Sequence, residues 1–225
     1  MICWKISLIV CIIYMYHLTE GVTAMKESFV ITIGREFGSG GRETGEILAE
    51  KLGIKCYDKE LLKEISEASG LQEQYIESMD EKSPGVFPMS SIVTASTAQV
   101  DFNSPSMKAY IAQFSTIQNI ADRENCIIIG RCADYILSEK ENVLNIFIYA
   151  DMEKRIERVM RVYGLDAREA KKRIGREDKK RAQYYEYYTD KKWGARDSYD
   201  LCINTGTLGT EKTAELIANI VTGKF

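Results

Sequence analysis

The sequence predicts an α/β protein in which helices cover both faces of a parallel β-sheet. Short apolar runs alternate along the chain with longer segments of helical periodicity, a pattern typical of such a sheet. The chain has 225 residues, enough for one domain with a substantial core. Hydrophobic residues make up 45% and charged residues 28%, which is ordinary for a soluble globular protein. We therefore expect a single domain over residues 25–225.

Five runs read as strands, because they are short, apolar and bounded by turn or helix signals. These runs are Phe29–Gly34, Ile54–Tyr57, Cys126–Ile129, Val143–Ala150 and Leu201–Asn204. The segments between them show helical spacing, and Thr210–Thr222 is expected as the closing helix. No internal repeat interrupts this alternation, so the sequence predicts one sheet.

Polar residues mark the starts of several expected helices. Asp58 and Asp151 each stand where a helix N-cap would be. Asp166 with Glu169 resembles a capping box, and it opens a highly charged segment that runs to about Thr189.

One further helix start and one loop stand out in the middle of the chain. Ser104-Pro105 combines a capping hydroxyl with proline at the first helical position. The Ser/Thr-rich stretch Ser83–Ser104 before it has no strong period. Its length predicts a mobile loop with a functional role.

Residues 1–24 differ from the rest of the chain. Lys5 precedes the apolar stretch Ile6–Leu18, which is short for a membrane-spanning helix. We expect this leader to be an extension upstream of a start at Met25, because the first strand begins a few residues later. The alternative is a signal-like segment with a small-residue cleavage site at Val22-x-Ala24. On the first interpretation residues 25–225 are cytoplasmic and carry no membrane segment.

Composition excludes several classes of chemistry. The only histidine is His17, so Ser-His or Cys-His hydrolases and His-ligated metalloenzymes fit poorly. The six cysteines form no C-x-x-C pair, which disfavours a zinc site or a disulfide framework. A net charge of −3 gives no general reason to expect a nucleic-acid partner.

A glycine-rich segment, Gly34–Arg42 (GREFGSGGR), lies between the first expected strand and the following helix. Such a turn lets several backbone N–H groups converge on phosphate oxygens at a helix N-terminus. The standard motif G-x-x-x-x-G-K-[ST] is absent, because Gly34 to Gly40 is one residue too long. Gly41 or Arg42 stands where lysine is expected. Alone, the segment fits a nucleotide site and an ordinary glycine turn about equally; its candidate phosphate-binding residues are Gly34, Gly38, Ser39, Gly40, Gly41, Arg42 and Thr44.

Five ordered blocks resemble the cytidylate kinase-like family, a branch of the P-loop nucleotide kinases. They are ITIGREFGSGGRETGEILAEKLG, CYDKELLKEI, IIIGRCADYIL, NIFIYADMEKRIERV and DKKRAQYYEYYTDKKWG…YDLCINT. The resemblance extends from about Ser28 to Val221 and includes the arginine-containing GSGGR loop. It implies a three-layer P-loop kinase fold with a five-stranded parallel sheet. An acceptor-binding flap region (58–125) and a lid region (164–195) would complete it.

The same resemblance implies ATP and Mg²⁺ as cofactors and a pyrimidine monophosphate as the acceptor. The Gly130-Arg131 pair, after the third strand, would then contact the acceptor phosphate. Relatives usually place Asp after that arginine, whereas this chain has Cys132. Protein ligands for the metal, the oligomeric state and the exact acceptor nucleotide stay open.

Phosphoryl transfer requires positioning and charge neutralisation, for which arginine is well suited and histidine unnecessary. We predict that Arg42 holds the ATP phosphates and that Arg131 grips the acceptor phosphate. A lid would carry Arg173, Arg176 and Arg181, with Arg176 and Arg181 ranked ahead of Arg173.

Other charged and aromatic residues keep two interpretations. Asp58 could contact the acceptor or simply cap a helix, and Asp178 could orient a lid arginine or pair with Arg181 at the surface. Arg155 and Arg158 fit the phosphate cleft and an exposed face equally well. An aromatic cluster is expected to pack the lid: Tyr184, Tyr185, Tyr187, Tyr188 and Trp193.

The leading hypothesis is thus a nucleoside-monophosphate kinase that transfers the ATP γ-phosphoryl group to CMP or dCMP. Two alternatives remain at this stage. One is a nucleotide-binding regulatory protein with little turnover, favoured by the missing lysine. The other is a kinase for a different small acceptor.

Overall fold

The computed structural model describes residues 28–80 and 104–223. The expectations for residues 1–24 and for the Ser83–Ser104 loop before its last residue lie outside these ranges. Among the described residues, no helix is long and apolar enough to cross a membrane.

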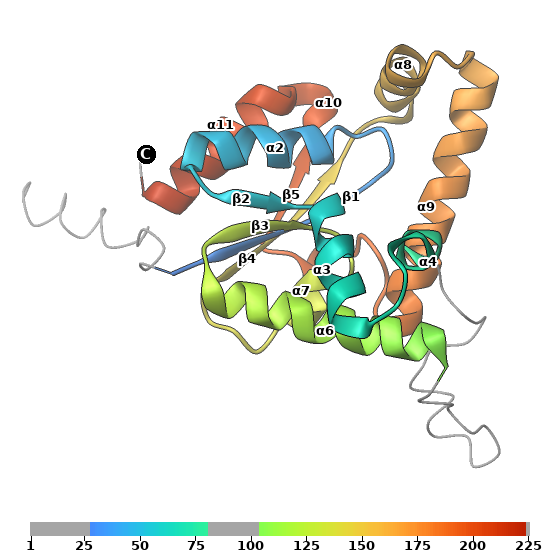
Figure 1. Ribbon diagram of the computed structural model, residues 1–225. Coiled ribbons are helices and arrows are strands. Elements are labelled where there is room, and N and C mark those ends of the chain that lie inside the picture. Colours follow the sequence, from blue (N-terminus) through green and yellow to red (C-terminus); the bar gives the residue numbers. More distant parts are fainter. Residues whose placement is uncertain (1–27, 81–103, 224–225) are drawn as a thin grey trace, which may run out of the picture.

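One five-stranded sheet forms the centre of the fold (Figure 1). All four strand pairs are parallel, in the order β2-β3-β1-β4-β5. The strands are β1 (Val30–Arg35), β2 (Lys55–Tyr57), β3 (Cys126–Ile129), β4 (Val143–Tyr149) and β5 (Leu201–Asn204). The predicted five-stranded parallel sheet is confirmed. The first strand includes Arg35, beyond the expected end at Gly34, because Arg35 still pairs with Ile148.

Helices follow the strands as the alternation predicts. The first five described helices are α2 (Gly41–Leu52), α3 (Lys59–Ser69), α4 (Glu73–Met79), α6 (Pro105–Arg123) and α7 (Ala133–Ile136). The remaining elements are α8 (Met152–Tyr163), α9 (Ala167–Thr189), the 3-10 turn η1 (Arg196–Ser198), α10 (Thr205–Leu208) and α11 (Thr210–Thr222).

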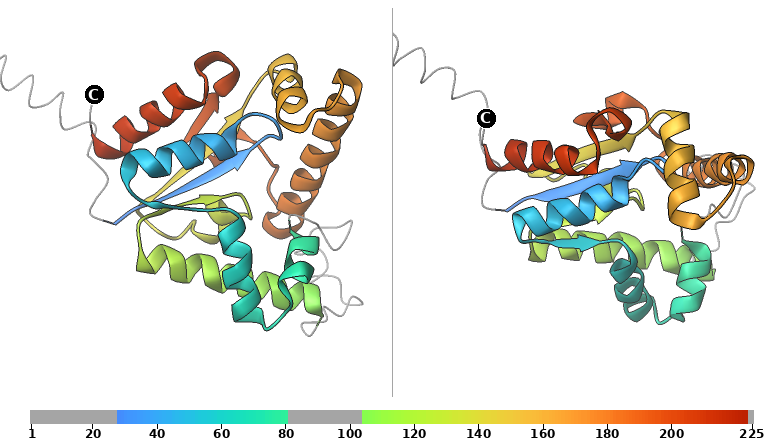
Figure 2. Two further views of the ribbon diagram at one scale, coloured as in Figure 1. Left: turned by 45° about the horizontal axis from the view of Figure 1, so that its top comes forward. Right: turned by 90° about the horizontal axis from the view of Figure 1, so that it is seen from above.

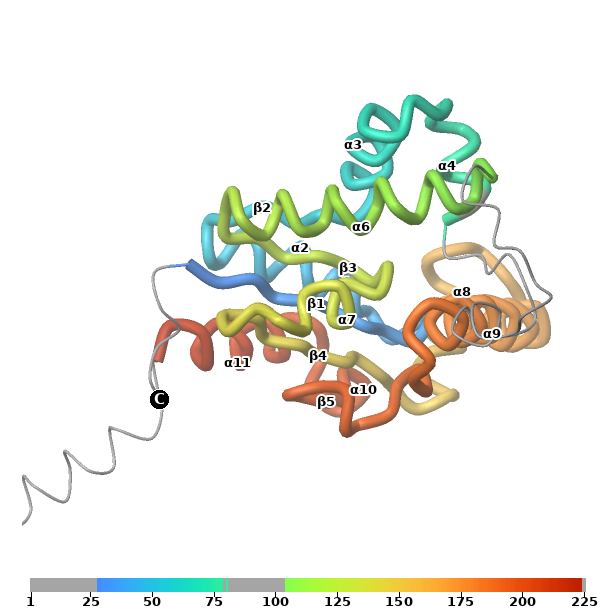
Figure 3. Tube along the Cα trace, turned by 90° about the horizontal axis from the view of Figure 1, so that it is seen from below, coloured from blue at the N-terminus to red at the C-terminus, as the bar shows by residue number. Residues whose placement is uncertain are grey.

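Two apolar cores confirm that helices cover both faces of the sheet (Figure 3). On one face, Ile31 and Ile33 of β1 pack with Leu48 of α2 and Ile217 of α11. On the opposite face, buried residues of α3, α6 and α7 pack around Ile128 of β3. Alternate side chains of a strand point to opposite faces, so one run of isoleucines can supply both cores.

Helices α8 and α9 form an arm beside the carboxyl ends of the strands (Figure 2). The two helices contact each other through Val159, Ala170 and Ile174. The C-terminal half of α9 carries the predicted aromatic cluster, which packs with Cys132 of the loop after β3. The aromatic residues therefore fix the arm to the body of the protein, as expected for lid packing.

The predicted helix caps are partly confirmed. Met107 N donates to Ser104 Oγ at 3.3 Å, and Glu169 N donates to Asp166 Oδ1 at 2.8 Å. Asp58 and Asp151 occupy N-cap positions but make no capping side-chain hydrogen bond. The predicted N-cap positions of these two aspartates are confirmed, but the capping hydrogen bond is not formed. For Asp58 the reason is competition, because two guanidinium groups bind its carboxylate instead.

This contrast predicts a matched pair of stability effects. Asp166→Ala removes the cap of α9 and should lower the free energy of unfolding by about 1 kcal/mol. Asp151→Ala removes an aspartate from an equivalent position without a capping bond, so its effect should be within about 0.5 kcal/mol. Urea unfolding followed by circular dichroism measures both. Equal losses for the two variants would contradict the assigned caps.

Candidate active site

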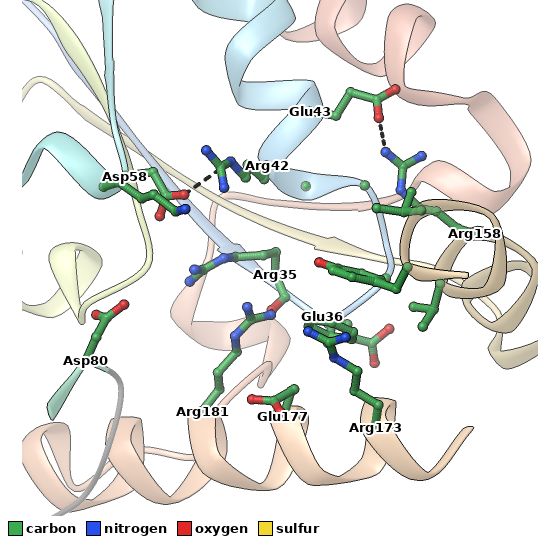
Figure 4. A pocket seen from close by; sticks show the side chains of 18 of the residues that line it. Arg35, Glu36, Arg42, Glu43, Asp58, Asp80, Arg158, Arg173, Glu177 and Arg181 are labelled. Carbon is green, nitrogen blue, oxygen red and sulfur yellow. Dashed lines mark hydrogen bonds and ion pairs between the residues drawn. The ribbon is translucent and has the colours of Figure 1, made fainter. Parts of the chain in front are cut away.

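A cavity of about 680 Å³ opens at the carboxyl ends of β1, β2 and β3, between the glycine-rich loop and α9 (Figure 4). Parallel α/β sheets bind ligands at this edge. Charged side chains of both signs dominate its lining. They are Arg35, Glu36, Arg42, Glu43, Glu46, Asp58, Lys59, Glu77, Asp80, Arg131, Arg158, Arg173, Glu177, Lys180 and Arg181.

The glycine-rich loop reverses the chain tightly between β1 and α2. Gly38 and Gly40 have φ values of +79° and +85°, a region that side-chain-bearing residues rarely adopt. Ser39 is buried, and its hydroxyl donates to Glu36 O at 2.9 Å. The turn thus delivers the loop backbone to the N-terminus of α2, where helix dipole and N–H groups favour an anion.

Arg131 occupies the corner of the cavity opposite the loop. Its side chain is only 2% exposed, and its guanidinium contacts Asp58 at 2.9 Å and Asp80 at 3.0 Å. The same group donates to Ile129 O at 2.7 Å. These contacts aim a buried cation at the cavity in one fixed orientation.

The backbone that carries Arg131 is unusual. Gly130, Arg131 and Cys132 have φ values of +71°, +55° and +56° in succession. Two of these residues bear side chains, for which the left-handed region costs about 1 kcal/mol or more each. Packing of Cys132 within the tyrosine cluster and the ion pairs of Arg131 hold this conformation. Strain of this kind is characteristic of functional sites.

Asp58 balances the positive charge of this corner. It follows β2, whose neighbour is β3, so the topology places it beside Arg131. Burial alone would raise the pKa of Asp58, but the guanidinium groups of Arg131, Arg35 and Arg42 hold the pKa below its ordinary value. Asp58 is therefore ionised near neutral pH and keeps Arg131 charged and oriented.

Helix α9 contributes two arginines to the cavity. Arg181 Nη1 donates to Arg35 O at 3.1 Å, which ties the helix to the end of β1. Arg173 lies over the rings of Tyr163 and Phe37, at 4.0 Å and 5.4 Å from their centroids. Arg173 Nε is buried and makes no hydrogen bond within the described part of the chain. This N–H group is suited to donate a hydrogen bond to an anionic ligand.

Asp178 joins α9 to the loop itself. Phe37 N donates to Asp178 Oδ1 at 2.8 Å, and Arg155 of α8 pairs with the same carboxylate. Arg155 is 4% exposed and also contacts Glu36 at 3.1 Å. Burial raises the pKa of Glu36, although Arg155 opposes that rise. Asp178 thus positions α8 and α9 against the loop, and the expected surface pair with Arg181 is not its role here.

The structure brings together most of the residues that the sequence singled out. Eight of them line the cavity: Gly38, Gly40, Gly41, Arg42, Asp58, Arg131, Arg173 and Arg181. Arg176, in contrast, is 60% exposed and pairs with Glu177. The placement therefore favours Arg173 over Arg176, contrary to the order expected from the sequence, and the roles of both stay predictions. The cause is helical position, since Arg173 lies eight residues from Arg181 and shares its face of α9.

Several other predicted residues support the loop from behind. Gly34 lies within β1 against Phe147 and Tyr199, and Gly130 precedes Arg131 without lining the cavity. Thr44 is fully buried, and its hydroxyl donates to Gly40 O at 3.0 Å. Gly34 and Thr44 thus support the glycine turn, Gly130 belongs to the backbone that carries Arg131, and none of the three lines the cavity.

Sequence reasoning missed several charged residues of the site, among them Arg35, Glu36, Asp80 and Lys180. Arg35 and Glu36 sat within the glycine-rich segment, and their place at the end of a parallel strand was a usable signal. Asp80 gave none, because only the fold brings the end of α4 to Arg131. Arg155 and Arg158, left open above, both belong to the arm that faces the loop.

A dedicated metal site is not formed by the described residues. They contain no group of three or more His, Cys, Asp or Glu side chains that could hold an ion. The hydroxyl of Thr44 faces backbone, and Arg42 stands directly after Gly41 at the start of α2. Mg²⁺ commonly keeps several waters and binds through substrate phosphates. We therefore derive no step through a protein-held metal.

Fold and site together define a kinase: a glycine turn before a helix, buried arginines across one cavity, and an arm that carries further arginines. The protein belongs to the cytidylate kinase-like family, whose model matches residues 30–207. It is 24% identical to the cytidylate kinase of Archaeoglobus fulgidus, over 85% of this chain and 93% of that protein. It is 25% identical to the cytidylate kinase of Methanopyrus kandleri, over 84% and 91%.

Solved structures agree with the fold. An uncharacterised protein from Eubacterium ventriosum is 31% identical, with a TM-score of 0.65 over 86% of this chain and 98% of that one. A shikimate kinase from Bacteroides thetaiotaomicron, 14% identical, has a TM-score of 0.50 over 86% and 98%. The predicted three-layer P-loop kinase fold is confirmed, and the chain is a nucleotide-binding phosphotransferase. Family membership implies, in general terms, a nucleoside triphosphate donor used with Mg²⁺.

Proposed function

We propose that this protein transfers the γ-phosphoryl group of ATP to CMP or dCMP. One observation supports the proposal: two groups suited to bind phosphate face each other across a single cavity. The first is the glycine turn at the start of α2, and the second is the buried guanidinium of Arg131. A donor and an acceptor phosphate bound there would meet beneath Arg173 and Arg181 of α9.

The chemistry requires no protein nucleophile. An oxygen of the CMP phosphate attacks the γ-phosphorus of ATP, and the bond from that phosphorus to the β,γ-bridging oxygen breaks. ADP leaves, and CMP becomes CDP. Phosphate monoesters lose their second proton at a pKa of about 6, so the acceptor is mainly dianionic at neutral pH. The protein supplies alignment and positive charge, which are the main needs of phosphoryl transfer.

The choice of acceptor rests on kinship and on the Asp58–Arg131 corner. The two relatives that are matched over 93% and 91% of their own length are both named cytidylate kinases. The matched family model includes the glycine-rich loop, the Asp58–Arg131 corner and α9. The corner suits a phosphate monoester, because a planar guanidinium can bind two of its oxygens at once. Arg131 would exchange a carboxylate partner for the acceptor phosphate as it binds.

An ADP-formation assay with residues 25–225 tests this function. The reaction contains ATP, Mg²⁺ and one of CMP, dCMP, UMP, AMP or GMP, each against a control without acceptor. We expect the highest kcat/KM with CMP or dCMP. Turnover with a different acceptor alone would keep the kinase and discard the pyrimidine assignment. ADP formation at the same rate with and without an acceptor would contradict a monophosphate kinase.

A second candidate is a nucleotide-binding regulatory protein with little turnover. The observation in its favour is the loop, which lacks the standard lysine and turns the Thr44 hydroxyl towards backbone. Tight binding of ATP, with no acceptor-dependent ADP formation across the panel, is the outcome that favours it.

A further inference from the structure

The position of the missing lysine can be fixed from the structure. Gly40 is the N-cap of α2, and Gly41 is the first residue of the helix. In the standard motif, the lysine directly follows the last glycine, and the first glycine stands five residues before that last one. Counted from Gly40, Gly41 holds the lysine position and Arg35 holds the position of the first glycine. The chain has therefore exchanged a glycine and a cation between these two positions.

Steric contact explains why the exchange is reciprocal. A Cβ atom added at Gly41 would lie 2.6 Å from Arg35 Cβ and 3.2 Å from Arg35 Cγ. Real Cβ atoms do not approach so closely, so a side chain at Gly41 and the present Arg35 exclude each other. Gly41 has an ordinary helical backbone. The position therefore requires glycine because space is short, not because of its backbone conformation. The Arg35 side chain fills the volume from which a lysine would start.

The Arg35 side chain is also well placed to bind the donor phosphates that the lysine binds in the standard motif. Its residue is 8% exposed and lines the cavity beside the loop. In Figure 4 its guanidinium lies between Arg42 and Arg181, on the side of the cavity towards Asp58 and Asp80. Its charge helps to hold the pKa of Asp58 below the ordinary value, as expected for a cation near the acceptor corner. Its backbone is anchored within β1 and by Arg181.

Arg42 fits this task less well, although it is the arginine that the motif suggests. Its side chain is 52% exposed, although it also lines the cavity. Its Nε lies 2.9 Å from Glu46 and 3.3 Å from Asp58. The Arg42 guanidinium is thus engaged by two carboxylates and half exposed to solvent, whereas Arg35 is buried.

We infer that Arg35 is the cation that contacts the γ-phosphoryl group of the donor nucleotide, in place of the P-loop lysine. The inference rests on the proposed function, and it makes Arg35 a catalytic residue that motif searches overlook. It also explains how a loop without lysine can belong to an active kinase. The Arg35 side chain extends from the end of β1 and would reach the same phosphate from the other side of the turn.

The test compares Arg35→Ala, Arg35→Lys and the double variant Arg35→Gly/Gly41→Lys, which restores the standard order of glycine and lysine. We expect Arg35→Ala to lower kcat about 10³-fold, the lower end of the range for a cation at a transferring phosphoryl group. Arg35→Lys should lose less. The double variant should recover at least tenfold over Arg35→Ala. Lys51→Ala, on the exposed far end of α2, is the control and should match the wild type.

A binding readout keeps the test independent of turnover. The dissociation constants of ADP and ATP are measured by calorimetry in the presence of Mg²⁺. Contact with the γ-phosphate should make ATP bind roughly tenfold more tightly than ADP, since a charge-assisted hydrogen bond contributes this much. In Arg35→Ala the ratio should fall to about one. If the wild type transfers no phosphoryl group but shows this ratio and its loss, the proposed function fails and Arg35 keeps its assignment.

Three outcomes would overturn the assignment. They are a kcat of Arg35→Ala within about threefold of wild type, an unchanged ratio of dissociation constants, and a larger loss in Arg42→Ala than in Arg35→Ala. Circular dichroism shows whether the double variant folds. If it does not, the kcat values of Arg35→Ala and Arg35→Lys and the ratio of the ADP and ATP dissociation constants still test the assignment.

Discussion

Arg131→Ala is expected to lower kcat/KM for CMP by about 10³-fold while ATP binds with nearly unchanged affinity. Two charge-assisted hydrogen bonds to one phosphate are together worth about 3–6 kcal/mol, or roughly 10² to 10⁴ in rate. Arg131 is buried at the acceptor corner, where it contacts Asp58, Asp80 and Ile129 O. The effect should therefore fall on the acceptor side alone.

Steady-state kinetics with CMP, together with calorimetry of ATP, measures this separation. Arg131→Lys keeps the charge and loses the planar fork, so it should show an intermediate loss. Arg123→Ala is the matched control, because Arg123 is an exposed arginine of α6 outside the cavity. An equal loss of ATP affinity in Arg131→Ala would contradict its role as the acceptor ligand.

Arg173→Ala and Arg181→Ala should each lower kcat by about 10²-fold, with Arg176→Ala within about threefold of wild type. The first two side chains line the cavity, whereas Arg176 points outward and pairs with Glu177. Each removed arginine withdraws positive charge from the transferring phosphoryl group. Single-turnover measurements separate this step from nucleotide binding.

Arg168→Ala serves as the control for these variants, since Arg168 is an exposed arginine in the first turn of α9. A larger loss in Arg176→Ala than in Arg173→Ala would restore the order expected from the sequence. It would also mean that α9 acts in a rotated position during catalysis.

The fold was largely predictable because burial dictates it. Strands such as Cys126–Ile129 and Leu201–Asn204 are short apolar runs with clear boundaries, and their observed limits match the expectation. The helix Thr210–Thr222 ends at Gly223, whose left-handed φ terminates it as expected. Local pattern and global fold agree at these positions, as they do in most of the sheet.

The site was less predictable because its geometry depends on tertiary contacts. Arg131 was identified from its motif, but its partner Asp80 comes from the end of α4, far away in sequence. The motif drew attention to Arg42, whereas the steric exchange between Arg35 and Gly41 is visible only in three dimensions. Spacing alone likewise did not decide which arginines of α9 face inward.

A bisubstrate analogue tests the central claim most directly, namely that one cavity holds a donor and an acceptor phosphate face to face. The probe is a cytidine and an adenosine joined through their 5′ positions by five phosphates. We predict that one molecule binds per chain, competes with both ATP and CMP, and loses affinity in Arg35→Ala and in Arg131→Ala. Competition with ATP alone, with unchanged affinity in Arg131→Ala, would contradict the account.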